Sequence, residues 1–196
     1  MKMNCAACKN KECQNGTMIK DIDMGFIKEY RDEQNESLFR TAAAVEADGY
    51  MKLTRIEELI LFAKRCGYKR LGIAFCIGLE HEAHILYKVL KQHFKVSSVC
   101  CKMGGINKDG FGLKKIHEEK SEVICNPIGQ AEILKQCGTE LNIICGLCIG
   151  HDILFNKYSA APVTTFIVKD RVLGHNPVSA LYSNYYKERL LPENNK

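Results

Sequence analysis

From residue 70 onward, short apolar runs alternate with amphipathic stretches, and no other feature of the sequence restricts its fold as strongly. Short apolar runs of this kind are typical of parallel strands that are covered on both faces. The expected strands are 71–76, 96–101, 122–125, 141–145 and 163–168. Because helical stretches separate them, we expect an α/β fold, a three-layer sandwich with a mainly parallel five-stranded sheet that is flavodoxin-like or Rossmann-like.

Amphipathic helices are expected before, between and after these strands. Two precede the first strand: one over 36–47, and one that Thr54 opens through a capping box with Glu57. The others are 80–94, 114–120, 129–137, a helix from about Gly150, and 178–191. Residues 1–20 have no hydrophobic periodicity. We therefore predict two parts, a cysteine-rich metal-binding knuckle over 1–20 and a single α/β domain over 21–196.

The composition favours a folded cytoplasmic protein. The chain has 196 residues, 46% of them hydrophobic, which is enough for one substantial core. Its net charge of +5 is spread along the chain rather than gathered in a basic stripe, so nucleic-acid binding is not expected. The first residues are too polar for a secretory signal, and the longest apolar stretch, 141–150, is far shorter than the roughly 20 residues that span a membrane. We expect no membrane contact.

The chain has eleven cysteines, an odd number. Disulfides rarely persist in the cytosol, so metal ligation or thiol chemistry becomes the leading explanation for them. A free cysteine also behaves as a small buried hydrophobe, and that alternative applies at each position. We assign Cys66 and Cys137 to packing because each precedes a glycine that ends a helix, at the far end of its crossover.

The sharpest local pattern is Cys5-x2-Cys8-x4-Cys13. A two-residue spacer lets two thiolates face one metal ion across a tight turn, as in zinc knuckles and iron–sulfur loops. The pattern supplies three ligands, so a fourth would come from elsewhere in the chain, from a small molecule or from a second subunit. The alternative is a flexible terminus that happens to be rich in cysteine.

Further cysteines are expected at the carboxyl ends of the strands: Cys76, Cys101, Cys125, Cys145 and Cys148. Ligands of open α/β sheets bind in the crevice outside those ends, so these thiols should share one site. Strand alternation allows only one of the adjacent Cys100 and Cys101 to face the crevice; we choose Cys101 and assign Cys100 to packing. Cys125 and Cys148 precede expected helix starts, where the helix dipole favours a thiolate, and they are the candidate catalytic residues.

Other residues that could lie near this edge are His81, His84, His151, Lys169, Arg171 and His175. The spacing of His81 and His84 is three residues rather than the four of a zinc-protease helix, and a solvated helix start is the favoured explanation for them. The loop 104–112 is rich in glycine but lacks the ending of a P-loop, so it supports nucleotide binding only weakly and could serve as a lid.

Five segments carry a family resemblance. They are Cys5-x2-Cys8-x4-Cys13, Gly78-Leu-Glu-His-Glu-Ala83, Cys125-Asn-Pro-Ile-Gly-Gln130, Gly146-Leu-Cys-Ile-Gly-His-Asp152 and Gly174-His-Asn-Pro177. Through them the chain resembles, across nearly its whole length, a prokaryotic family of unknown function, domain-of-unknown-function 1847. That family is described only as cysteine-rich metal-binding proteins. The resemblance implies metal binding through the matching cysteines and implies no reaction.

Thiolate-rich sites select iron–sulfur clusters, zinc or copper(I) over magnesium and calcium. We predict a metal-binding protein whose metal ligands are Cys5, Cys8, Cys13, Cys76, Cys101, Cys125, Cys145 and Cys148. An iron–sulfur cluster is favoured over zinc because the cysteines outnumber the four ligands of a zinc site. The alternatives are a zinc-stabilised scaffold or metallochaperone without catalysis, and a metal-free, thiol-based sulfurtransferase or redox protein. A small-molecule or sulfur-containing substrate is compatible with this site, and the sequence leaves the oligomeric state open.

Overall fold

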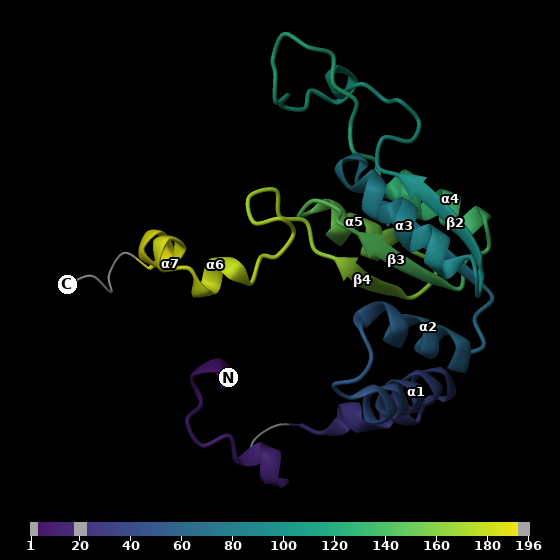
Figure 1. Ribbon diagram of the computed structural model, residues 1–196, viewed down its shortest axis with the longest axis vertical. Helices are drawn as coiled ribbons and strands as arrows, with labels where there is room; N and C mark the ends of the chain where they lie inside the picture. Colours follow the sequence, from purple (N-terminus) through teal and green to yellow (C-terminus); the bar gives the residue numbers. More distant parts are fainter. Residues whose placement is uncertain (1–3, 18–22, 192–196) are drawn as a thin grey trace.

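The sheet of this protein has four parallel strands. A computed structural model describes residues 4–17 and 23–191. Its strands, β1 (Arg70–Phe75), β2 (Lys95–Cys100), β3 (Leu141–Cys145) and β4 (Val163–Ile167), lie in the order β2-β1-β3-β4 (Figure 1). The prediction of an α/β fold with a parallel sheet is confirmed, and the prediction of five strands is wrong. The predicted domain boundary after residue 20 lies outside the described residues.

Helices cover both faces of the sheet (Figure 1). α3 (Glu80–Leu90) connects β1 to β2 on one face, while α4 (Pro127–Gln136) and α5 (His151–Tyr158) pack together on the other. α1 (Glu33–Gly49) and α2 (Arg55–Arg65) precede the sheet and pack against each other. Right-handed crossovers to either side of β1 place helices on opposite faces, which accounts for this order of layers.

Two features of the helix starts follow directly from the sequence. The Asp32 carboxylate accepts hydrogen bonds from the backbone N–H groups of Gln34 and Asn35, at 3.1 and 3.3 Å, and begins α1. The predicted capping box of α2 is confirmed, and the Thr54 backbone N–H donates to Glu57 Oε2 at 2.7 Å. These contacts satisfy backbone donors that have no partner within the helix.

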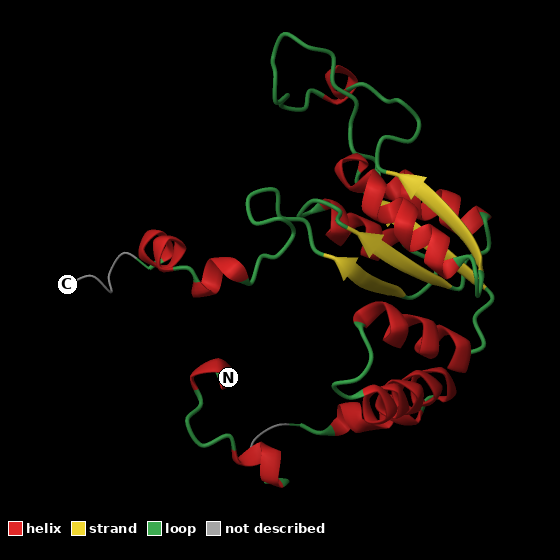
Figure 2. Ribbon diagram, in the orientation of Figure 1, coloured by secondary structure: helices red, strands yellow, loops and turns green. Residues whose placement is uncertain are grey.

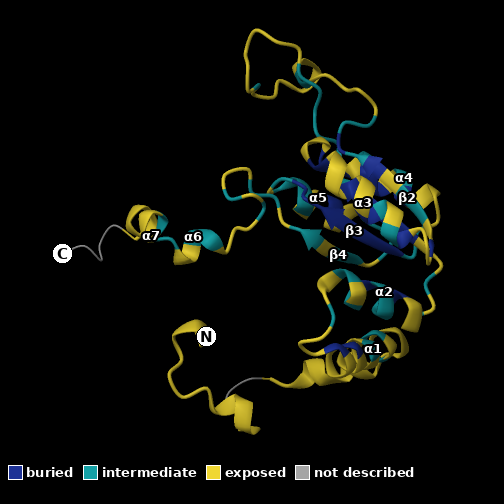
Figure 3. Cartoon of the chain, viewed as in Figure 1, coloured by how far each residue is buried: buried dark blue, intermediate teal, exposed yellow. Residues whose placement is uncertain are grey.

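The core lies along the two central strands (Figure 3). β3 is buried along its whole length, and four of the six residues of β1 are buried. Helices on both faces explain why these strands consist of unbroken apolar runs. Phe75 pairs in register with both Cys100 and Cys145, so the chain segments that follow β1, β2 and β3 leave the sheet at the same level.

The expected strand over 122–125 is not in the sheet (Figure 2). The Ile124 N–H donates to the Ile106 carbonyl and the Lys108 N–H to the Glu122 carbonyl, both at 2.8 Å, in a short antiparallel contact. The expected helix over 114–120 is also wrong, because those residues form turns and bends. A parallel neighbour of β2 needs a crossover connection, usually helical, and none forms between β2 and this segment.

The end of the described chain differs from its prediction as well. Two short helices, α6 (Ser179–Tyr182) and α7 (Asn184–Leu190), replace the single helix expected over 178–191, and Ser183 between them is extended. Neither contains a buried residue, and both extend away from the sheet (Figures 1 and 3). We call residues 179–191 the C-terminal arm. None of the described helices is long and apolar enough to cross a membrane.

Candidate functional site

Three cysteines from three segments of the chain meet at the carboxyl edge of the sheet. Cys76 follows β1, Cys101 follows β2, and Cys125 precedes α4. The Cys101 thiol lies between the other two and is hydrogen-bonded to both. We call these three residues the thiol cluster.

Backbone hydrogen bonds hold the thiol cluster in place. The Cys101 N–H donates to the Phe75 carbonyl, and the Asn126 N–H donates to the Cys101 carbonyl, both at 2.8 Å. The Ile77 N–H donates to Cys101 Sγ at 3.4 Å. Cys101 and Cys76 are buried and Cys125 is half-buried, so the cluster approaches solvent on the Cys125 side.

The three thiols of the cluster have pKa values shifted in different directions. The hydrogen bond to Cys101 lowers the pKa of both Cys76 and Cys125 below the ordinary cysteine value, while burial acts in the opposite direction. The same hydrogen bonds, to Cys125 and Cys76, raise the pKa of Cys101, and burial raises it further. Cys101 therefore keeps its proton. Because a thiol has one proton to donate, Cys101 stabilises one neighbouring thiolate at a time.

Positively charged groups face the two outer thiols. Lys169 hydrogen-bonds to Cys76 and contributes to the low pKa of that thiol, after the larger effect of Cys101. Electrostatic interactions with Lys102 and His151 contribute to the low pKa of Cys125, after the larger effect of Cys101, and Lys102 also hydrogen-bonds to this thiol. An opposite charge near a thiol favours its ionised form. The surroundings of the cluster thus favour thiolates and offset their negative charge.

Cys148 lies at the same edge, just before α5. Arg171 Nη2 donates a hydrogen bond to Cys148 Sγ at 2.9 Å. Electrostatic interactions with Cys148, Cys76 and Cys125 also raise the pKa of Arg171, after the hydrogen bond to Cys148. Arg171 therefore faces both the fourth thiol and the thiol cluster.

Cys145 differs from these residues because it belongs to the core. Its side chain has no exposed surface, and burial raises the pKa of the thiol to about 12. The charges of Glu82 and Cys76 act in the same direction. Of the cysteines assigned to packing, Cys66 and Cys100 are half-buried, whereas Cys137 is exposed, so that assignment is wrong for Cys137.

The N-terminal cysteines Cys5, Cys8 and Cys13 are all exposed. They lie in or beside two short 3-10 turns, Cys5–Ala7 and Glu12–Asn15, in a segment apart from the thiol cluster (Figure 1). Within residues 4–17 and 23–191, no group of three or more histidine, cysteine, aspartate or glutamate side chains is arranged to hold a metal ion. The cysteines predicted as ligands therefore divide into the thiol cluster, Cys148 beside it, Cys145 in the core and this exposed triplet.

The histidines have separate surroundings. His151 faces Cys125, while His81 and His84 line a groove of about 600 Å³ along α3. His175 Nδ1 accepts a hydrogen bond from the Asp170 N–H at 3.1 Å within a turn.

Lys102 was not identified as a site residue from the sequence. Its only signal in the sequence was its position next to Cys101.

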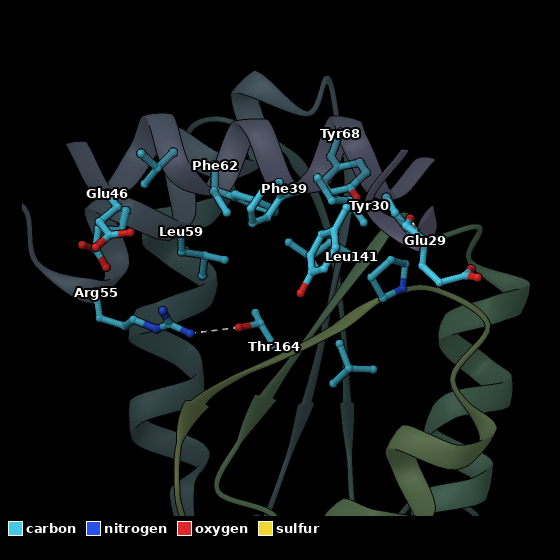
Figure 4. Close-up of a pocket in the computed structure, with 17 residues that line it drawn as sticks. Glu29, Tyr30, Phe39, Glu46, Arg55, Leu59, Phe62, Tyr68, Leu141 and Thr164 are labelled. Atoms are coloured by element: carbon cyan, nitrogen blue, oxygen red, sulfur yellow. Dashed lines mark hydrogen bonds between the residues drawn. The ribbon is translucent and has the colours of Figure 1, made fainter. Parts of the chain in front are cut away.

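A second site that sequence reasoning missed is a cavity at the amino end of the sheet (Figure 4). It has a volume of about 720 Å³ and lies between α1, α2 and the start of β4. Aromatic side chains contribute much of its lining: Tyr30, Phe39, Phe62 and Tyr68. Arg55 Nη2 donates to Thr164 Oγ1 at 3.0 Å in its wall. We call it the aromatic cavity.

Comparison with known proteins assigns the chain to a family of unknown function. A family described as a protein of unknown function, DUF1847, matches residues 13–166, which include the whole thiol cluster. An uncharacterized protein of Methanocaldococcus jannaschii, MJ0455, is 58% identical over 190 residues, covering 96% of this chain and 98% of the relative. No solved structure matches the chain significantly. The chain therefore belongs to the DUF1847 family.

Proposed function

We propose that this protein binds a soft metal through cysteine thiolates at the carboxyl edge of its sheet, as an iron–sulfur cluster or as zinc. The observation that carries the proposal is the pair of side-chain hydrogen bonds by which Cys101 joins Cys76 and Cys125, which come from three separate segments. Because these side chains are not arranged to hold a metal ion in the described structure, metal binding would require their rearrangement. Cys148 beside Arg171 is the nearest candidate for a fourth ligand. Soft thiolate donors of this kind suit zinc and iron–sulfur clusters and disfavour magnesium and calcium.

The charges around the site support this proposal. Four cysteine thiolates around a divalent zinc ion carry a net charge of −2, and such a complex is stable only where that charge is offset. Lys102, Lys169 and Arg171 face the thiols and can offset it. Binding through all three cluster thiolates also requires Cys101 to release its proton, since metals bind the thiolate form.

The strand order and the cysteine content support two further parts of the proposal, the type of α/β fold and the cellular location. The strand order β2-β1-β3-β4 agrees with the first four strands of the flavodoxin-like order, so we favour that fold over a Rossmann-like one. Free cysteines at this density are compatible with a reducing compartment, and we place the protein in the cytoplasm. Both assignments belong to the proposal.

The test is metal analysis of the full chain after anaerobic purification without added metal. We expect stoichiometric iron and sulfide with visible absorption, or stoichiometric zinc without colour. Cys101→Ser should lose the metal, and the exposed, distant Cys137→Ser is the matched control that should keep it. Metal-free wild type, or Cys101→Ser with full metal content, would contradict the proposal. A variant of Cys5, Cys8 and Cys13 to serine shows separately whether the N-terminal triplet supplies ligands.

A second candidate function is metal-free thiol chemistry, and the Arg171 contact at Cys148 Sγ favours it. A guanidinium at 2.9 Å stabilises a thiolate, which is the nucleophilic form of cysteine. In metal-free protein, Arg171→Met removes this charge-assisted hydrogen bond and should slow alkylation of Cys148 by iodoacetamide. Unchanged alkylation of Cys148 would argue against this candidate.

A further inference from the structure

The chain exposes more surface than a folded monomer of its size. A compact protein of 22.1 kDa exposes about 9,300 Å² according to the scaling of area with mass. This chain exposes 14059 Å². Segments that leave the body of the fold, such as α6 and α7, contribute to this excess of about 4,700 Å². Their surface is available to a second chain.

The C-terminal arm is a large unpartnered part of that surface. Its two helices pack against each other, and none of their residues is buried. Aromatic and aliphatic side chains of the arm are nevertheless exposed: Leu181, Tyr182, Tyr185, Leu190 and Leu191. Apolar side chains concentrated on a short segment that leaves the body are typical of an interaction site.

The aromatic cavity offers a surface that matches the arm. Its lining contains the exposed ring of Phe39 and the rings of Tyr30 and Tyr68 (Figure 4). Three glutamates and one arginine also line it, whereas α7 carries two basic residues and one acidic residue. Both the arm and the cavity carry exposed apolar side chains, and the net charge of the cavity lining is negative whereas that of α7 is positive.

The course of the chain directs the arm away from its own cavity. The turn before the arm is fixed by hydrogen bonds: the His175 N–H donates to the Asp170 carbonyl at 2.8 Å, and Asp170 Oδ1 accepts from the N–H groups of Val172 and Leu173 at 2.9 and 2.8 Å. This turn lies after β4, at the carboxyl edge of the sheet, whereas the cavity lies at the amino edge. In Figure 1 the arm extends away from α1 and α2.

We propose that the C-terminal arm of one copy docks into the aromatic cavity of a second copy, in a reciprocal homodimer. Aromatic side chains such as Tyr182 and Tyr185 enter the cavity, and the basic residues of α7 approach the glutamates at its walls. The metal-binding proposal plays no part in this inference, because the cavity that receives the arm lies at the edge of the sheet opposite to the thiol cluster, and the docking side chains belong to residues 179–191.

Light scattering coupled to size-exclusion chromatography tests the dimer with the full chain. We expect wild type at twice the 22.1 kDa mass of the chain. Leu181→Asp on the arm and Phe39→Asp in the cavity should each weaken the dimer by at least about 30-fold, the effect of removing one interface hot spot. These residues are 63% and 56% exposed, so both variants should fold. Ile116→Asp, at an 82% exposed residue between β2 and α4, is the matched control.

Mixing the variants identifies the two contacting surfaces. The arm of Phe39→Asp is intact and so is the cavity of Leu181→Asp, so an equimolar mixture should form heterodimers with one complete contact. Mass spectrometry after cross-linking detects them. Monomeric wild type, dimeric variants, or a mixture of variants that remains monomeric would each overturn the proposal. Thermal unfolding of each variant, together with Tyr185→Asp as a second arm variant, separates loss of the interface from loss of the fold.

Discussion

The burial of Cys145 has a measurable consequence for stability at alkaline pH. Its side chain is fully buried, and burial raises the pKa of the thiol from 9.0 to about 12. In the unfolded chain this thiol loses its proton near pH 9, whereas in the folded protein it remains protonated to about pH 12. A raised pKa stabilises the folded state below the unfolded value, and this contribution is lost as pH rises toward the folded value.

The size of the loss follows from the two pKa values. At pH 10 the unfolded thiol is ionised about ten to one while the folded thiol is neutral, so the free energy of unfolding falls by about 1.4 kcal/mol relative to low pH. At pH 8 the corresponding loss is less than about 0.1 kcal/mol. Wild type should therefore lose about 1.4 kcal/mol more between pH 8 and pH 10 than Cys145→Ala, which has no thiol to ionise.

Urea unfolding of both proteins at the two pH values measures this difference. The small void left by Cys145→Ala lowers stability equally at both pH values, and the other titrating groups are common to both proteins, so their effects cancel. Cys137→Ala, at an exposed thiol, should behave as wild type. An equal loss of stability in wild type and Cys145→Ala would refute the argument that Cys145 is a buried, neutral thiol.

Three further changes have defined outcomes. Cys101→Ala removes the hydrogen bond that contributes most to the low pKa of Cys125, about 5, so in metal-free protein the pH at which alkylation of Cys125 reaches half its maximal rate, followed by mass spectrometry, should rise to about 6–7. Gly146→Ala should lower the free energy of unfolding by more than about 2 kcal/mol in urea titrations, since residue 146 has a φ of +71° and an added Cβ would collide with Leu79. Asn142→Ala removes two hydrogen bonds of 2.8 Å made by a buried side chain and should lower the thermal midpoint, at a cost of about 2 kcal/mol.

The sequence predicts correctly those elements whose pattern depends only on neighbouring residues, such as doubly covered strands and helix caps. The apolar runs that became β1 and β3 need no partner to be recognised, because a strand covered on both faces must be apolar throughout. The capping box of Thr54 and Glu57 is likewise a contact within one helical turn. Such signals located most of the helices and four of the strands.

The errors occurred where the structure depends on contacts between distant segments. Residues 122–125 have strand-like composition, but their hydrogen bonds go to 106–108, and sequence composition does not specify a strand's partner. The aromatic cavity depends on the spacing between α1, α2 and β4, which a one-dimensional pattern does not contain. Lys102 acquires its role only because the neighbouring Cys101 meets Cys125 in space.

The proton of Cys101 links the two functions proposed for the carboxyl edge and sets them against each other. Nucleophilic chemistry at Cys125 uses that proton in place, because the hydrogen bond to Cys101 is what lowers the pKa of Cys125. A metal ion that takes all three thiolates must displace the same proton, so its affinity rises with pH while the thiol cluster is being deprotonated. Nearby cations, chiefly Lys102 and Lys169, support both outcomes because they stabilise a thiolate whether or not a metal is bound. Occupancy of Cys101 by a proton or by a metal therefore decides which chemistry the site can perform.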